Sequence, residues 1–297
     1  MKDNLVILGG GIAGLIWSYY HPESIIITDQ IGGQFSSKFQ LGPKYLHVDE
    51  NTKKFFKDLG IKPPTKKIKI GFYYDGELHS ENTEENRKKY FEKTRGSSSE
   101  PYRSVMSANK TEFDSYDIGV DELINILKDK IQSKVILERI TEIDLFTHEI
   151  ITESGKLKFG KLISTIPMNI FMFMANKPNI AKQYQSFPTT FILGDRRDCL
   201  IKDFQDFDYV YVSDEQYPFH RLTKTSKGIV FEYKGDDLPL LLSEKDRYVM
   251  KTGQLIHNDI KVNFQNVKFW GRYGCWNHGI KVNDLLKGIY EEIRLTL

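Results

Sequence analysis

The sequence predicts an α/β protein in which helices cover a parallel sheet. Residues 5–8 form a short, wholly apolar run, which is typical of a strand buried on both faces. A run of glycines and a helical pattern over 12–20 follow it, and a second apolar run over 24–28 predicts the next parallel strand. With 297 residues, 40% of them hydrophobic, the chain is long enough for about two domains with buried cores.

Charge and cysteine content narrow the class of protein. The 42 basic and 40 acidic side chains leave a formal net charge of +2, which argues against a generalised electrostatic grip on nucleic acid or an anionic membrane. Cys199 and Cys275 are the only cysteines, too few for a disulfide scaffold or a cysteine-based zinc site. Because the sequence shows neither a signal-peptide pattern nor an apolar run of about 20 residues, we expect a cytoplasmic protein without a membrane span.

Three glycines between the first strand and the first helix form the pattern G-x-G-x-x-G. Gly9 permits the tight turn, Gly11 lets a pyrophosphate approach the backbone, and Gly14 allows the helix to pack closely on the strand. The helix begins at Ile12 and Ala13, and its N-terminus offers free N–H groups to a phosphate. The pattern in this context predicts a dinucleotide site.

An acidic residue closes the second predicted strand. Asp29 lies twenty residues after Gly9, where a carboxylate accepts hydrogen bonds from a ribose diol. The same negative charge would repel a ribose 2′-phosphate, which disfavours NADP. The alternative interpretation of this region is a glycine-rich turn in an ordinary α/β sheet.

The sequence has five segments, 29–34, 41–48, 135–143, 162–167 and 269–284, that resemble segments of a known family. This family is the FAD-dependent amine oxidoreductase superfamily, which includes flavin amine oxidases, protoporphyrinogen oxidase-like proteins and UDP-galactopyranose mutases. Residues 29–34 and 41–48 are similar to its N-terminal region, with Gly42 and His47 matching a G-x-H-x-x-H stretch of the mutases and Lys44 replacing the first histidine. Residues 135–143 are similar to a strand whose backbone contacts adenine, which implies a contact at Ile140.

Later segments extend the resemblance. Residues 162–167 resemble the return of the chain to the flavin domain, and residues 269–284 look like the closing FAD motif. The resemblance implies that Gly271 and Arg272 lie at the pyrophosphate. It implies an FAD cofactor that also contacts Gln30, Gly33, Gln34 and Thr165.

The resemblance also implies a helix that begins near Lys281 and Val282, with its N-terminus toward the flavin. Reduced flavin carries negative charge around N1 and the C2 carbonyl, and the N–H groups and positive dipole end of a helix would stabilise that charge. The alternative is a buried strand and an amphipathic helix that only seals the sheet.

Because the resemblance implies that both ends of the chain bind one cofactor, the expected fold class is α/β, with a discontinuous Rossmann-like FAD-binding domain and an inserted α+β substrate domain. The FAD-binding domain is assigned to residues 1–62, 114–167 and 263–297. The substrate domain is assigned to residues 63–113 and 168–262.

The expected substrate domain contains several recognisable elements. An Asp75-Gly76 turn predicts a hairpin, and the polar stretch over 80–93 predicts a solvent-facing helix. Residues 93–103 have loop composition, which fits either a mobile lid or a solvated loop. Residues 169–175 fit a packed core helix better than a channel wall, and residues 217–222 and 229–233 predict an antiparallel pair of strands.

Candidate residues for the substrate face are few. Arg221 is the best candidate for binding an anionic group, since its planar guanidinium suits a carboxylate or phosphate, and a surface ion pair is the alternative. Strand alternation points His220 away from the Arg221 side. The resemblance places His47 near the flavin ring, against the alternative of an ordinary histidine in a sheet or loop. Aromatic residues that could line the cavity, or equally the core, are Tyr217, Trp270, Tyr273 and Trp276.

The resulting functional prediction is an FAD-dependent oxidoreductase that transfers a hydride from a C–N or related bond of a small anionic or amine-bearing molecule to flavin N5. One alternative is a mutase-like, non-redox flavoenzyme, for which Arg95 or Arg103 would supply a second arginine. Two further alternatives are a flavoenzyme acting on an amine-bearing base in nucleic acid, and a non-catalytic nucleotide-binding protein. No Ser-His-Asp order, zinc-type histidine spacing or Walker loop occurs.

Overall fold

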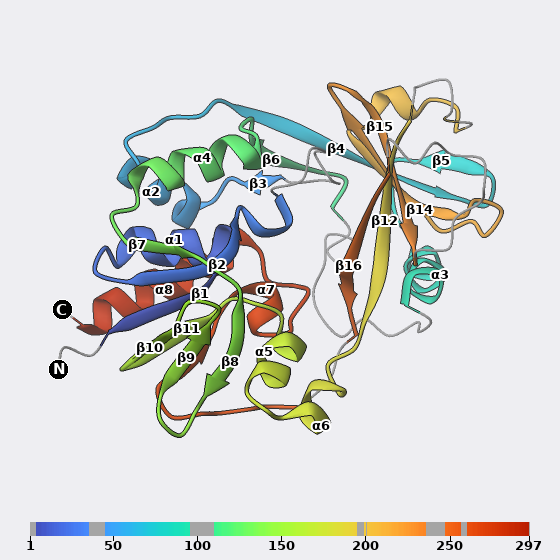
Figure 1. Ribbon diagram of the computed structural model, residues 1–297. Coiled ribbons are helices and arrows are strands. Elements are labelled where there is room, and N and C mark those ends of the chain that lie inside the picture. Colours follow the sequence, from blue (N-terminus) through green and yellow to red (C-terminus); the bar gives the residue numbers. More distant parts are fainter. Residues whose placement is uncertain are drawn as a thin grey trace.

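The computed structural model describes most of the chain (Figure 1). The described residues are 4–35, 45–95, 110–194, 199, 201–235, 247–256 and 260–296. Two sheets dominate this part of the chain, and both termini lie on the side of the parallel sheet that is remote from the larger sheet (Figure 1). Among the described helices, none combines the length and apolar content that crossing a membrane requires.

The first sheet has five strands, all of them parallel. Its order is β17 (Val267–Phe269), β11 (Lys161–Ser164), β1 (Leu5–Gly10), β2 (Ile25–Ile31) and β7 (Lys134–Leu137). The central strand β1 contributes Val6, Ile7 and Leu8, all fully buried, as expected for a strand covered on both faces. The sheet therefore combines strands from the beginning, middle and end of the chain, which confirms the predicted discontinuous α/β architecture.

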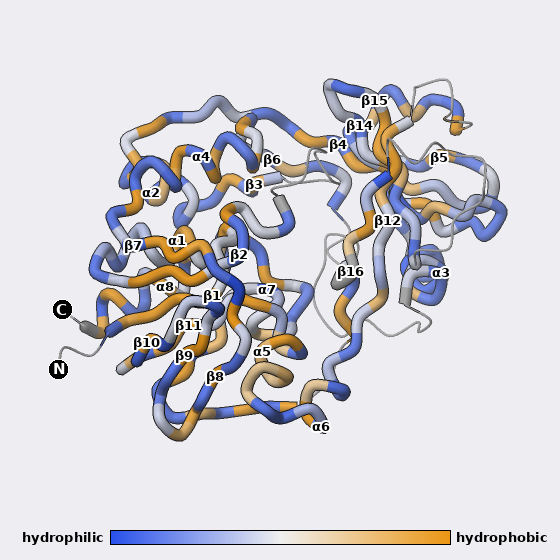
Figure 2. Tube along the Cα trace, viewed as in Figure 1, coloured by the Kyte–Doolittle hydropathy of each residue, from blue (hydrophilic) through white to orange (hydrophobic). Residues whose placement is uncertain are grey.

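Four helices pack together on one face of this sheet. They are α1 (Ile12–Tyr20), α2 (Glu50–Asp58), α4 (Val120–Lys130) and α8 (Val282–Thr296). In α4 the buried residues Val120, Leu123, Ile124 and Leu127 follow the spacing of a single helix face. Hydrophobic segments of these helices and of the parallel strands face one another in Figure 2. The bounds of α1 agree with the sequence-based expectation.

The other face of the parallel sheet is covered by a small antiparallel sheet and two short helices. The small sheet consists of β8 (Ile140–Asp144), β9 (Glu149–Thr152) and β10 (Lys156–Lys158), and the two helices are α5 (Met168–Met174) and α6 (Pro178–Ala181). Phe171 and Met172 are fully buried here, so α5 is a packed helix, but it packs beside the parallel sheet instead of in the second domain where it was expected.

The prediction of one strand over 135–143 is wrong. The chain leaves the parallel sheet after β7 at Leu137 and starts the antiparallel hairpin at Ile140. Glu138 donates its backbone N–H to Thr28 O at 3.0 Å, which ties the junction to the end of β2. One apolar run in the sequence thus supplies two strands of different sheets.

The larger sheet has nine strands, most of which lie apart from the parallel sheet (Figure 1). Its order is β16 (Arg247–Leu255), β12 (Ser186–Gly194), β15 (Gly228–Lys234), β14 (Phe219–Thr225), β13 (Tyr209–Val212), β4 (Thr65–Tyr74), β6 (Glu112–Tyr116) and β3 (Leu46–His47), and β5 (Glu77–His79) also pairs with β4. The predicted hairpin is present, with positive φ angles of 53° at Asp75 and 79° at Gly76. The predicted antiparallel pair is present as β14 and β15.

One helix covers part of this sheet. The polar stretch forms α3 (Glu84–Arg95), but the prediction that it faces only solvent is wrong, because Tyr90 and Phe91 are buried in an apolar cluster with Phe72 and Tyr211. Charged residues on the exposed side obscure this apolar face in the sequence. The segment predicted as a lid or loop, 93–103, lies outside the described residues beyond Arg95.

Candidate dinucleotide site at the end of the parallel sheet

The glycine loop after β1 is shaped by contacts that side chains would prevent. Gly9 has a φ of 100°, and a Cβ atom there would lie 2.6 Å from Thr165 Oγ1. A Cβ atom on Gly14 would lie 2.0 Å from the carbonyl oxygen of Gly9, so only glycine lets α1 pack this closely on the strand. Thr165 itself donates a hydrogen bond to Leu8 O at 2.8 Å, which joins the end of β11 to the loop.

Gly11 differs from these two glycines because a side chain would meet no protein atom. No atom lies within 4 Å of its ideal Cβ position. Gly11 is the N-cap of α1, no side chain caps this helix, and its first turn, which contains Ile12 and Ala13, has no acidic residue. The loop thus combines open space with an uncapped helix N-terminus, which is the arrangement that a pyrophosphate requires.

Two segments distant in sequence approach this loop. A Cβ atom on Gly33, which begins the 3-10 helix η1 (Gly33–Phe35), would lie 3.2 Å from the Cα atom of Gly11. Gly271 begins the short helix α7 (Gly271–Gly274) with a φ of 81°, and a Cβ atom there would lie 2.9 Å from Ala13 Cβ. Beginning and end of the chain therefore meet at the start of α1.

Polar groups surround the meeting point. Asp29 is exposed at the end of β2, and Gln30 Nε2 donates to Gly33 O at 3.2 Å. Tyr273 donates its hydroxyl proton to Gln34 Oε1 at 2.7 Å, which links α7 to η1. Arg272 Nε and Nη2 each lie 3.4 Å from Ile280 O, so its guanidinium reaches toward the start of α8.

The start of α8 and His47 are electrostatically coupled. Helix α8 begins at Val282, as predicted, and the backbone N–H of Lys281 donates to Asp284 Oδ2 at 2.9 Å. Burial is the main cause that lowers the pKa of His47 to about 4, and the positive charges of Lys281 and Lys110 contribute. His47 therefore stays neutral near pH 7, with its ring stacked on Phe113 at 4.2 Å between centroids.

Several residues expected at the substrate face belong to the packed interior. Tyr217 packs on Tyr73 and Phe219, with ring centroids 5.3 and 5.2 Å apart, in the apolar cluster of the large sheet. Trp276 is buried and donates its indole N–H to Ile256 O at 3.0 Å. Ile140, which was expected to contact adenine and not the substrate, is buried at the start of β8 in the apolar cluster on the other face of the parallel sheet. The alternative of core packing thus describes the contacts of Tyr217 and Trp276.

Arg221 lies in the large sheet, where it pairs with a carboxylate that the sequence analysis missed. Arg221 Nε donates to Glu232 Oε2 at 2.7 Å and Nη2 contacts the same oxygen, while His220 Nε2 lies 3.2 Å from Glu232 Oε1. Glu232 is buried and the Arg221 side chain is 22% exposed, so the ion pair of the alternative forms within the sheet and not at the protein surface. Glu232 is the only acidic residue in the apolar run 229–233, and this isolated charge could have indicated a buried ion pair.

The expectation that His220 and Arg221 point to opposite sides is also wrong. The register between β14 and β15 shifts between Phe219 and Arg221, which marks an irregularity in the pairing of the strands. Such a bulge breaks the alternation of side chains and lets two consecutive residues approach one partner, here Glu232.

Comparison with solved structures shows which proteins share this fold. Reduced UDP-galactopyranose mutase aligns with a TM-score of 0.70 and 13% identity, over 99% of this chain and 94% of that chain. An oxidoreductase from Methanosarcina mazei gives a TM-score of 0.61 at 10% identity, over 98% and 100% of the two chains. A redesigned putrescine oxidase gives 0.53 at 8% identity, over 79% and 76%.

No protein-family model and no curated protein sequence matches the chain. The structural likeness extends over nearly the whole chain in two of the three alignments, although the sequences have diverged almost completely. The chain therefore shares its fold with these three proteins, and its parallel sheet is Rossmann-like.

Proposed function

We propose that the chain is an FAD-dependent oxidoreductase that removes a hydride equivalent from a C–N or related bond of a small molecule. The observation that carries this proposal is the meeting of the Gly9–Gly14 loop, Gly33 and the Gly271–Arg272 turn at the start of α1. The space next to the Cβ position of Gly11 is open. Where other segments come close to the loop, at Gly14, Gly33 and Gly271, the residue is a glycine. An extended diphosphate ligand accounts for both features.

The residues around the loop fit the parts of FAD. The uncapped N-terminus of α1 at Gly11 and the Arg272 guanidinium would hold the pyrophosphate, and Asp29 would accept hydrogen bonds from the ribose. The N-terminus of α8 at Val282 would place its positive dipole end toward the flavin ring. Neutral His47, close to Lys281, would border the ring without adding charge.

Bound FAD would supply the redox chemistry by accepting a hydride at N5. The chain would contribute binding and electrostatics: α8 stabilises negative charge on the reduced cofactor, and the aromatic cluster that includes Phe113 and Tyr209 excludes water from the His47 side. An amine-bearing substrate fits this division of roles, because its oxidation requires no metal ligand or nucleophilic side chain.

A second candidate is a non-redox, mutase-like flavoenzyme. The TM-score of 0.70 to UDP-galactopyranose mutase, over 99% of this chain, favours it. A diphosphate substrate would need free guanidinium groups, whereas Arg221 is paired with Glu232. The described residues therefore support the oxidoreductase more than the mutase.

Cofactor analysis followed by anaerobic reduction tests the proposal. The purified protein should be yellow and should release a molecule with the mass of FAD on denaturation, and candidate amines should bleach its absorbance without oxygen. If only dithionite, and no amine, bleaches the flavin absorbance, and if the reduced protein then converts a UDP-sugar, the mutase alternative would be established. A colourless protein that cannot be reconstituted with FAD would leave only the non-catalytic interpretation.

A further inference from the structure

Tyr273 joins the candidate cofactor site to the large sheet through two contacts of its hydroxyl group. The hydroxyl donates to Gln34 Oε1 at 2.7 Å, and its oxygen lies 3.7 Å from the sulfur of Met250. Gln34 belongs to η1, whereas Met250 belongs to β16, the strand at one end of the large sheet. The three side chains therefore connect the two sheets next to the glycine loop.

Met250 is one of two described methionines that solvent reaches. It is partly exposed and packs at the margin of an apolar cluster of the large sheet. Within the described residues β16 pairs only with β12, so the strand is not enclosed by neighbours on both sides. Met168 and Met172 are buried, and Met174 is the other methionine with partial exposure.

Oxidation of Met250 by hydrogen peroxide would change the hydrogen bond of Tyr273. In this reaction the thioether sulfur takes one oxygen atom from the peroxide, the O–O bond breaks, the sulfur is oxidised to a sulfoxide and water leaves. A thioether is a weak acceptor, whereas a sulfoxide is polar and carries an acceptor oxygen. Because Tyr273 has one hydroxyl proton, donating it to the sulfoxide would leave Gln34 without its bond.

We infer that Met250 is an oxidation site through which hydrogen peroxide weakens cofactor binding. The inference rests on the proposed function, because dioxygen forms this peroxide when it reoxidises a reduced flavin. Tyr273 ties Gln34 of η1 to α7, and a Cβ atom on Gly33 of η1 would lie 3.2 Å from the Cα atom of Gly11. Loss of the tie loosens the segment that borders the pyrophosphate site, so the chain would lose affinity for FAD as peroxide accumulates.

Peroxide treatment of the FAD-loaded protein tests the inference. Peptide masses should show one added oxygen atom at Met250 and none at Met168 or Met172. The dissociation constant of FAD, measured from flavin fluorescence, should rise about twofold to tenfold, the range expected for one lost hydrogen bond. Methionine sulfoxide reductases with dithiothreitol should reverse the rise, whereas dithiothreitol alone, which reduces disulfides and sulfenic acids, should not.

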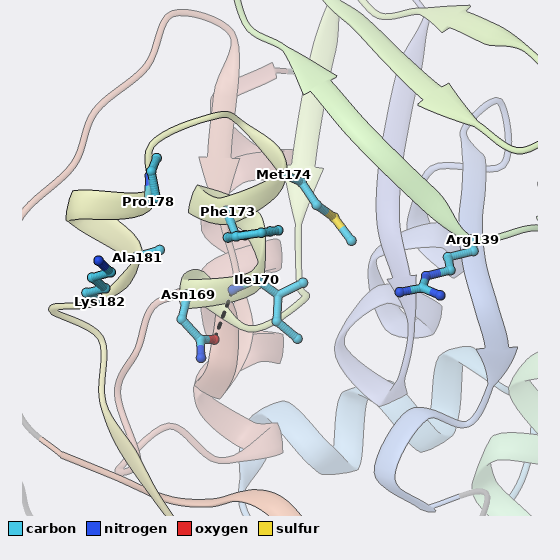
Figure 3. A pocket seen from close by; sticks show the side chains of 8 residues that line it. All are labelled: Arg139, Asn169, Ile170, Phe173, Met174, Pro178, Ala181 and Lys182. Atoms are coloured by element: carbon cyan, nitrogen blue, oxygen red, sulfur yellow. Dashed lines mark hydrogen bonds between the residues drawn. The ribbon is translucent and has the colours of Figure 1, made fainter.

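Three variants assign the effect to the contact between Met250 and Tyr273. Met250→Leu keeps a side chain of similar volume without sulfur and should retain its affinity for FAD after peroxide. Met174→Leu is the matched control and should lose affinity as the wild type does, because Met174 is also partly exposed but points into the cavity between α5 and Arg139 (Figure 3). Tyr273→Phe should bind FAD less tightly before treatment and lose little more afterwards, since it has no hydroxyl proton.

Hydrogen exchange supplies a readout that needs no flavin. In the apoprotein, peroxide should accelerate exchange of the η1 amides in the wild type and not in Met250→Leu. An unmodified Met250, equal loss of FAD affinity in Met250→Leu and the wild type, or unchanged exchange in η1 would overturn the inference while flavin binding stands. A wild type that binds no FAD would overturn the proposed function and the effect on the cofactor, and the exchange measurement would still decide whether Met250 controls η1.

Discussion

At the scale of single residues, Gly11 is a glycine that ligand binding would require but the fold does not. The backbone at Gly11 has a φ of −74°, which other residues adopt, and its missing side chain would meet no atom within 4 Å. The fold therefore does not require glycine at this position. Gly14 has the opposite property, because a Cβ atom there would collide with Gly9 O.

We expect Gly11→Val to abolish FAD binding while changing the free energy of unfolding little, because the valine side chain would fill the space meant for the pyrophosphate. Flavin content after purification and urea-induced unfolding of the apoprotein measure the two effects. Gly155→Val is the control, since Gly155 also has open space at its Cβ position but lies in the β9–β10 turn. Normal flavin content in Gly11→Val would contradict the placement of the pyrophosphate.

The lowered pKa of His47 should make the stability of the fold depend on pH. An exposed histidine takes up its proton near pH 6.5, whereas burial and the nearby lysines lower the pKa of His47 to about 4. Because the unfolded chain then binds more protons, the contribution of His47 to stability is complete above pH 6.5 and is lost as the pH falls toward 4. His47→Gln, which cannot titrate, should lose less stability over this range than the wild type does, by roughly 2 kcal/mol.

Urea unfolding at pH 7 and at about pH 4.5 measures this difference for both proteins. The comparison isolates His47 because all other titrating groups are shared. Parallel losses in the two proteins would show that His47 takes up its proton as readily in the folded state as in the unfolded chain.

At the scale of elements, the irregular pairing of β14 and β15 brings His220 and Arg221 to the buried carboxylate of Glu232 in the large sheet. Burial acts to raise the pKa of Glu232, but Arg221 and His220 hold it at about 2, so the carboxylate stays charged. Removing one partner of such a pair leaves an uncompensated charge in the interior.

We expect Glu232→Met to lower the free energy of unfolding by about 3–5 kcal/mol, because the Arg221 guanidinium would lose its partner. The double variant Arg221→Met/Glu232→Met should be more stable than this single variant, since no buried charge remains unpaired. Glu112→Gln is the control, because Glu112 pairs with Lys67 at the surface and should matter little. A double variant less stable than the single one would show that Arg221 stabilises the fold without Glu232, and would contradict an unpaired guanidinium as the cause of the loss.

At the scale of the whole molecule, the parallel sheet depends on the last part of the chain. Strand β17 pairs with β11, and Leu286 and Ile289 of α8 are fully buried against the helices on one face. The sheet and its candidate site are therefore incomplete until the end of the chain is in place.

A chain that ends at Asn266 should accordingly fail to form the FAD site, because it lacks β17, α7 and α8 and exposes the apolar surface they cover. Limited proteolysis should digest its N-terminal residues, and no flavin should bind. A chain that ends at Arg294, without exposed Leu295, is the control and should resist proteolysis like the wild type. A protease-resistant fragment from the shorter chain would show that the parallel sheet is stable without its last strand.

Local patterns in the sequence predicted the elements that depend on local interactions. The helix α1, the Asp75-Gly76 hairpin and the strands β1 and β2 follow from apolar spacing and glycine positions, which act through nearest neighbours. The predicted strand over 135–143 failed because its apolar spacing cannot indicate that Leu137 and Ile140 belong to different sheets.

What the sequence determined by itself is the glycine loop and the start of α8, because a tight turn, a close helix approach and a helix start require specific residues at specific positions. Only the tertiary structure decided that Gly271 meets Ala13, that Glu232 joins His220 and Arg221, and that Arg139 faces Phe173 across a cavity. These contacts join segments far apart in the chain, and they exist only once strand order and register are fixed by packing of the whole molecule.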